Sequence, residues 1–122
     1  MILVIDDDMD IRDSLAETLR VEGYEVLTAV DGSQALELLQ KGLRPKLILL
    51  DLMMPVMNGW KFLETVHERP EYAAIPVVVS TAMTSKEDSV QFAAAFIKKP
   101  MDLASLLDFV RKYCGPPMEK SA

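Results

Sequence analysis

Residues 47–59 read LILLDLMMPVMNG and place one aspartate at the end of four apolar residues. Residues 47–50 predict a buried strand, and Asp51 follows them directly, before a proline and a glycine break the apolar pattern. An ionised carboxylate that is buried without partners is so unfavourable that it would take up a proton instead. The rest of the sequence is therefore expected to supply positive charge near Asp51.

Short apolar runs alternate along the chain with longer segments of helical period, a pattern typical of repeated βα units and a parallel sheet. The predicted strands are residues 2–5, 24–29, 46–50, 75–80 and 95–98. The predicted helices are residues 8–21, 31–42, 58–68, 85–94 and 102–114, with Ser33 as a candidate cap of the second. In the first helix, one face is formed by Ile11, Leu15, Thr18 and Leu19. Five such units most often form a three-layer α/β fold with the parallel strand order 2-1-3-4-5.

The composition describes one globular domain. We expect a domain at residues 1–114 and a disordered polar tail at residues 115–122. The net charge of −6 argues against nucleic acid and anionic membranes as partners, since both favour basic patches. The single cysteine, Cys114, excludes an internal disulfide and favours a reducing compartment. There is no apolar run of membrane-spanning length and no signal peptide pattern, so a cytoplasmic protein is expected.

Three carboxylates are predicted to meet at one edge of the sheet. In an open parallel sheet, ligands bind beyond the carboxyl ends of the strands, where the strand order reverses. In the expected order that crevice lies between the first strand, which ends in Asp6-Asp7, and the third, which ends in Asp51. Two such charges about 4 Å apart repel by roughly 4 kcal/mol at an effective dielectric of about 20. A hard divalent cation relieves this repulsion, and oxygen ligands with room for water suit Mg²⁺.

The fourth and fifth strands end at the same rim, in Ser80-Thr81 and Lys98-Lys99. A hydroxyl and an ammonium group beside a Mg²⁺ site are what the oxygens of a phosphoryl group require. Asp51 would then act as a carboxylate nucleophile toward phosphorus. The metal and the lysine would neutralise its charge.

Residues 1 to about 114 resemble the receiver domain of bacterial two-component response regulators, of the single-domain, chemotaxis-regulator type with a flavodoxin-like fold. The segment ILVIDDDMDIRDSL (2–15) is similar to the family's acidic-pair opening, which implies a metal-binding role for Asp6 and Asp7. LILLDLMMPVMNG is similar to its phosphoacceptor segment. This resemblance implies that Asp51 is phosphorylated and that Met53 binds the metal through its backbone carbonyl.

The last two motifs are VVVSTA (77–82) and FIKKP (96–100). The resemblance implies that Thr81 is the switch hydroxyl, Lys99 the active-site lysine and Phe96 the switch aromatic. It also implies a cis peptide bond between Lys99 and Pro100, which proline permits. The stretch from Thr81 to Lys99 is about one helical turn shorter than is usual in the family, so a short fourth helix is expected.

The resemblance implies a phosphorylation-dependent signalling switch. Such a protein takes a phosphoryl group from a histidine kinase or phosphotransfer protein and signals through a downstream protein target or a phosphorelay. It is not an enzyme beyond catalysing its own phosphorylation and dephosphorylation, and it is expected as a monomer or weak dimer. Residues 115–122 are too few for an output domain, so signalling is expected to act through a protein partner or a phosphorelay.

Three other functions remain alternatives. A phosphorylation-independent docking module (a pseudo-receiver) is favoured only by the shortened segment before Lys99. A phosphatase-type hydrolase with an aspartyl nucleophile usually needs a second acid two residues after it, where this chain has Met53. A nucleotide- or flavin-binding module would need a glycine-rich phosphate loop after the first strand, and the sequence DDDMD at that place repels phosphate.

Overall fold

The computed structural model describes residues 1–51, 59–81, 93–98 and 103–115. Strands and helices alternate through most of these residues, as the sequence predicts. In chain order the elements are β1 (Ile2–Ile5), α1 (Met9–Val21), β2 (Val26–Ala29), α2 (Gly32–Gln40), β3 (Leu47–Asp51), α3 (Gly59–Glu68), α4 (Pro70–Ala73), β4 (Val77–Thr81), β5 (Ala95–Lys98) and α5 (Leu103–Cys114).

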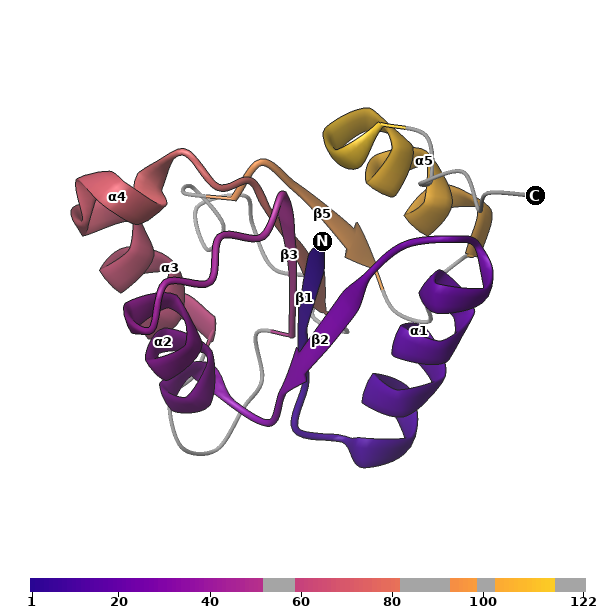
Figure 1. Cartoon of the computed structure of the whole chain (residues 1–122), viewed down its shortest axis with the longest axis horizontal. Coiled ribbons are helices and arrows are strands. Elements are labelled where there is room, and N and C mark those ends of the chain that lie inside the picture. Colours follow the sequence, from indigo (N-terminus) through magenta and orange to yellow (C-terminus); the bar gives the residue numbers. More distant parts are fainter. Residues whose placement is uncertain (52–58, 82–92, 99–102, 116–122) are drawn as a thin grey trace.

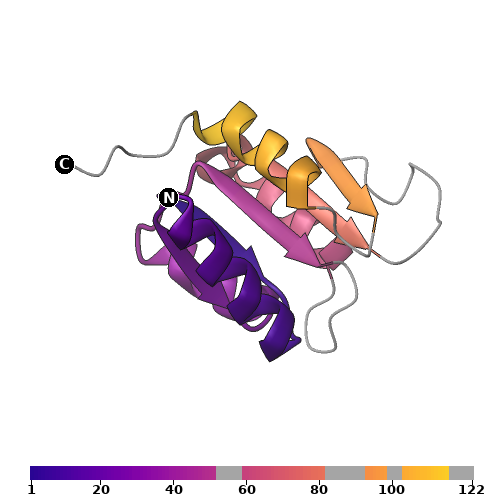
Figure 2. The ribbon, with the colours of Figure 1, turned by 90° about the vertical axis from the view of Figure 1, so that its right-hand side faces the viewer.

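The five strands form one parallel sheet in the order β2-β1-β3-β4-β5, which confirms the predicted topology. Figure 1 shows α1 and α5 on one side of this sheet and α2, α3 and α4 on the other. In Figure 2 the arrows of β3, β4 and β5 point the same way. The fold is therefore the expected three-layer α/β arrangement, and the carboxyl ends of the strands share one edge.

Alternate residues of β1, β3 and β4 contribute to two separate halves of the hydrophobic core. In β1, Ile2 and Val4 pack with α1 and α5, whereas Leu3 and Ile5 pack with α2, α3 and α4. All five residues of β3 are buried, Asp51 included. Burial on both faces is the reason why the strands are continuous apolar runs instead of alternating ones.

Helix ends follow local chemistry. The Asp8 carboxylate caps α1 by accepting hydrogen bonds from the backbone N–H groups of Asp10 and Ile11, at 3.0 and 3.2 Å. The prediction of Ser33 as the cap of α2 is wrong, because Asp31 takes that place and accepts a hydrogen bond from Gln34 N–H at 2.9 Å. Ser33 is the second residue of the helix and is exposed.

Three further expectations differ from the structure. The predicted apolar face of α1 is wrong at Ile11, which is 37% exposed, because the buried residues of that helix are Ala16 and Leu19. The short helix α4 was not predicted: Pro70 is its first residue, and its Tyr72 is buried. The predicted second and fourth strands each begin two residues later, at Val26 and Val77.

The end of α5 is tied to the turn between α1 and β2. Tyr24 Oη donates a hydrogen bond to the carbonyl oxygen of Gly115 at 2.9 Å. Burial raises the pKa of the Tyr24 hydroxyl, and it also raises the pKa of the half-buried Cys114 thiol. The thiolate of Cys114 is therefore scarce near neutral pH, as expected for a structural cysteine.

Two predicted segments lie almost wholly outside the described residues. In the predicted helix at residues 85–94, only Ala93 and Ala94 are described, and they are not helical. In the predicted tail at residues 115–122, only Gly115 is described. Across the described part of the chain, no helix combines the length and apolar character needed to cross a bilayer.

Candidate functional site

The carboxylates of Asp6, Asp7 and Asp51 meet at the carboxyl edge of the sheet. Ile5 of β1 is in register with Leu50 of β3, so the residues that follow them emerge side by side. One carboxylate oxygen from each of the three aspartates lies within 4.8 Å of the others. Asp6 and Asp51 are buried, at 2% and 5% exposed, while Asp7 is exposed. The structure thus brings together the three acids that the sequence places in one crevice.

Asp6 is held in place by hydrogen bonds from three directions. Its backbone N–H donates to the Ala29 carbonyl of β2 at 3.2 Å. Its Oδ1 accepts from the backbone N–H of Asp8 at 2.9 Å, and its carbonyl oxygen accepts from Arg12 Nη1 at 3.0 Å. Asp6 therefore presents its carboxylate from an ordered turn, in which its neighbour Asp8 serves as the cap of α1.

The strands β4 and β5 end at the same edge of the sheet as the acidic cluster. Asp51 is in register with Ser80, whose side chain is buried, and the next residue, Thr81, is in register with Lys98. The structure places Thr81 at the end of β4 and Phe96 within β5. Their side chains lie outside what it describes, as do Met53, Lys99 and Pro100 entirely.

The donor set suits a hard divalent cation. At a separation of 4.8 Å, two full negative charges repel by about 3.5 kcal/mol at an effective dielectric of about 20. Burial of two of the three carboxylates limits screening by water. The site offers three carboxylates, and Asp7 is exposed to solvent while the other two are buried. Mg²⁺ prefers carboxylate ligands together with water, and the site matches that preference.

Sequence reasoning missed Arg12. Its side chain is only 12% exposed, and it lies on α1 four and seven residues before the buried Ala16 and Leu19. A cation within the buried face of an amphipathic helix is unusual, because long charged side chains are rarely buried without a partner. That spacing was the signal in the sequence, and the hydrogen bond to the Asp6 carbonyl is the partner.

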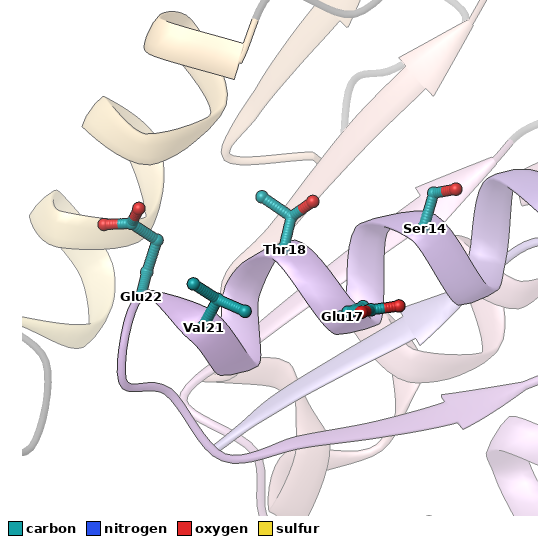
Figure 3. A pocket seen from close by; sticks show the side chains of 5 residues that line it. All are labelled: Ser14, Glu17, Thr18, Val21 and Glu22. Carbon is teal, nitrogen blue, oxygen red and sulfur yellow. The ribbon is translucent and has the colours of Figure 1, made fainter.

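A separate hollow of about 340 Å³ lies along α1 and is lined by Ser14, Glu17, Thr18, Val21 and Glu22. Figure 3 shows these side chains along the helix and the residue that follows it. The hollow lies on the later turns of α1, whereas the acidic cluster precedes the first turn. It is therefore not part of the site formed by the three aspartates.

Known proteins resemble the chain over nearly its whole length. Residues 2–111 match the family described as the response regulator receiver domain. An uncharacterized 14.6 kDa protein of Leptolyngbya boryana is 37% identical over 117 residues, which cover 93% of this chain and 88% of that protein. Other curated relatives are longer, and the chain spans 47% of one and 25% of another.

Solved structures agree with this match. The chemotaxis protein CheY4 of Vibrio cholerae superposes with a TM-score of 0.82 at 35% identity, covering 92% of this chain and 96% of that one. The response regulator TrrA of Thermotoga maritima, solved in complex with Mg²⁺-BeF, gives a TM-score of 0.81 at 31% identity, with coverage of 92% and 96%. On its sequence, its fold and its acidic cluster, the chain belongs to the response regulator receiver domain family.

Proposed function

We propose that the chain is a phosphorylation-dependent signalling switch in which Asp51 accepts a phosphoryl group in a Mg²⁺-dependent reaction. The observation that carries the proposal is the position of Asp51, buried at the end of β3 with Asp6 and Asp7 beside it. This position, at the carboxyl edge of the sheet, supports a role for Asp51 as a carboxylate nucleophile. The acids around it require a cation before a negatively charged donor can approach.

The proposed step transfers an anionic phosphoryl group from an imidazole nitrogen to a carboxylate. A carboxylate oxygen of Asp51 attacks phosphorus, and the bond from phosphorus to the imidazole nitrogen of a phosphohistidine breaks. The imidazole nitrogen leaves with that electron pair and takes up a proton from solvent, so that neutral imidazole is released. Bound Mg²⁺ would neutralise charge on the transferring oxygens. Asp6 and Asp7 would hold the metal, together with Asp51 and the backbone carbonyl of Met53.

The remaining roles follow from the family resemblance. The Lys99 ammonium and the Thr81 hydroxyl would bind oxygens of the phosphoryl group. Movement of Thr81 toward the phosphoryl group would leave space for Phe96, so the surface of β4 and β5 would shift between two arrangements. A protein target would then distinguish the two surfaces, or a phosphotransfer protein would take the group onward in a relay.

The proposed partners follow the same chemistry. The donor is a histidine kinase or phosphotransfer protein, and the site of action is the cytoplasm, where such donors present phosphohistidine. Related TrrA was solved in complex with Mg²⁺-BeF, which supports a Mg²⁺ site in this family. The net charge of −6 argues against nucleic acid as a direct target of this chain.

Intact mass after incubation with acetyl phosphate tests the proposal. One added phosphoryl group is expected with Mg²⁺ and none in EDTA, and Asp51→Asn should show none in either. Asp8→Asn is the matched control, because Asp8 is an exposed acid in the same turn and asparagine also caps helices. It should be phosphorylated like the wild type. A chain that gains no mass under any condition would favour the docking module, and a gain that persists in Asp51→Asn would disprove the assignment.

A further inference from the structure

Of the three hydrogen bonds described for Asp6, two come from main-chain groups and one from a side chain. The backbone N–H donates to Ala29 and the carboxylate accepts from the Asp8 N–H, so a side-chain substitution at Ala29 or Asp8 removes neither partner group. The third is donated by Arg12 Nη1 to the Asp6 carbonyl at 3.0 Å. Arg12 therefore links the first turns of α1 to the residue that begins the acidic cluster.

The charge of Arg12 does not favour metal binding. A guanidinium beside the cluster repels an incoming divalent cation, so by electrostatics alone it would weaken metal binding. Its ion pair with Asp13 is long, at 3.9 Å, and the Asp13 side chain is 68% exposed, so that pair contributes little. The hydrogen bond to Asp6 is the contact that accounts for a side chain only 12% exposed.

We infer that Arg12 is a positioning residue for the metal site. By holding the Asp6 carbonyl, it fixes the turn between β1 and α1 so that the carboxylates of Asp6 and Asp7 stay close to Asp51 against their mutual repulsion. A ligand set that is already assembled binds its metal more tightly than one that must be gathered. The inference rests on the proposed function, since it concerns the same site.

Arg20 provides a matched control on the same helix. Its Nη2 donates to the carbonyl of Val26 in β2 at 2.9 Å, so it too joins α1 to a strand through a main-chain acceptor. It lies in the last turn of α1, far along the helix from the acidic cluster. Substituting either arginine removes one charge and one such hydrogen bond, but only Arg12 touches Asp6.

The test is calorimetric titration of Mg²⁺ into the full chain and its variants, with thermal unfolding recorded in parallel. Arg12→Met is expected to raise the dissociation constant for Mg²⁺ about tenfold, the lower end of the effect of residues that support metal ligands. Arg20→Met should leave it within about twofold of the wild type while lowering the unfolding temperature comparably, since both variants lose one hydrogen bond.

The direction in which the dissociation constant for Mg²⁺ changes distinguishes a positioning effect of Arg12 from an effect of its charge. Loss of the Arg12 charge alone would tighten Mg²⁺ binding, so a constant that is unchanged or lower in Arg12→Met would overturn this inference and leave the proposed function standing. A wild-type chain that bound no Mg²⁺ would overturn both.

Arg12→Lys is the milder change, and the same titration can be made on it if Arg12→Met does not fold. Lysine keeps the charge but lacks the planar fork, so a rise of about threefold is expected. An unchanged constant in Arg12→Lys would overturn the assignment.

Discussion

Replacing Asp51 with asparagine is expected to stabilise the fold when no divalent cation is present. The carboxylates of Asp6 and Asp51 approach within 4.8 Å, and at that separation two charges repel by about 3.5 kcal/mol at an effective dielectric of about 20. Asparagine removes this repulsion and keeps the shape of the side chain, but it gives up the attraction of a carboxylate for nearby donors. We expect a net gain of about 1 to 3 kcal/mol in the free energy of unfolding. At about 4 °C per kcal/mol, this gain raises the unfolding temperature by about 4 to 12 °C.

Added Mg²⁺ should reduce or reverse this difference. At a concentration about one hundred times its dissociation constant, a ligand that binds only the folded state adds about 2.7 kcal/mol, and the wild type should gain this amount. Asp51→Asn lacks one of the three carboxylates and should gain far less.

Urea unfolding in EDTA and in Mg²⁺ measures both effects, and Asp8→Asn again serves as the control for loss of one exposed charge. An Asp51→Asn variant no more stable than the wild type in EDTA would refute the repulsion argument. Equal stabilisation of both proteins by Mg²⁺ would refute the ligand role of Asp51.

Other substitutions test the fold through urea unfolding. Asp31→Ala should lower the free energy of unfolding by about 1 kcal/mol because it removes the cap of α2. Ser33→Ala should change it by less than about 0.5 kcal/mol. Equal effects of the two substitutions would contradict the capping assignment. Leu106→Ala, at a fully buried position of α5, should lower the free energy of unfolding by about 3 kcal/mol. A loss below about 1 kcal/mol would show that the surrounding side chains collapse into the cavity. Burial raises the pKa of Tyr24 and of Cys114 above their usual values, so the unfolded chain releases these protons at a lower pH than the folded chain does. Stability should therefore fall as the pH rises past about 9, and a flat profile between pH 8 and pH 10 would exclude this linkage.

The parallel sheet and the acidic cluster could be predicted because both depend on short-range patterns. A strand covered on both faces must be apolar throughout, so the runs that became β1 and β3 are recognisable without knowing their neighbours. The rule that ligands bind at the carboxyl ends of such strands then places Asp6 and Asp51 together. No comparable rule fixes the side chains of Thr81, Phe96 and Lys99, whose roles stay predictions.

The features that were missed depend on tertiary contacts or on backbone angles. The predicted helix at residues 58–68 ends before Pro70, yet proline also suits the first position of a new helix, and burial of Tyr72 stabilises the turn that follows. Asp31 and Ser33 are both good caps, and the extended backbone of Asp31 decides between them. The acceptor for Arg12 is a main-chain carbonyl six residues earlier, which no side-chain pattern reveals.

The sheet divides the interior into two compartments that share only backbone. Neighbouring side chains such as Leu3 and Val4 belong to different compartments, so a change of volume on one face does not press directly on the other. Substitutions on opposite faces should thus be nearly additive, and each compartment can be repacked on its own during evolution or design. Asp51 is the last residue of β3, a central strand of the sheet that separates them. Any mechanical influence of a change at Asp51 on one compartment therefore passes through the hydrogen-bonded strands before it reaches the other.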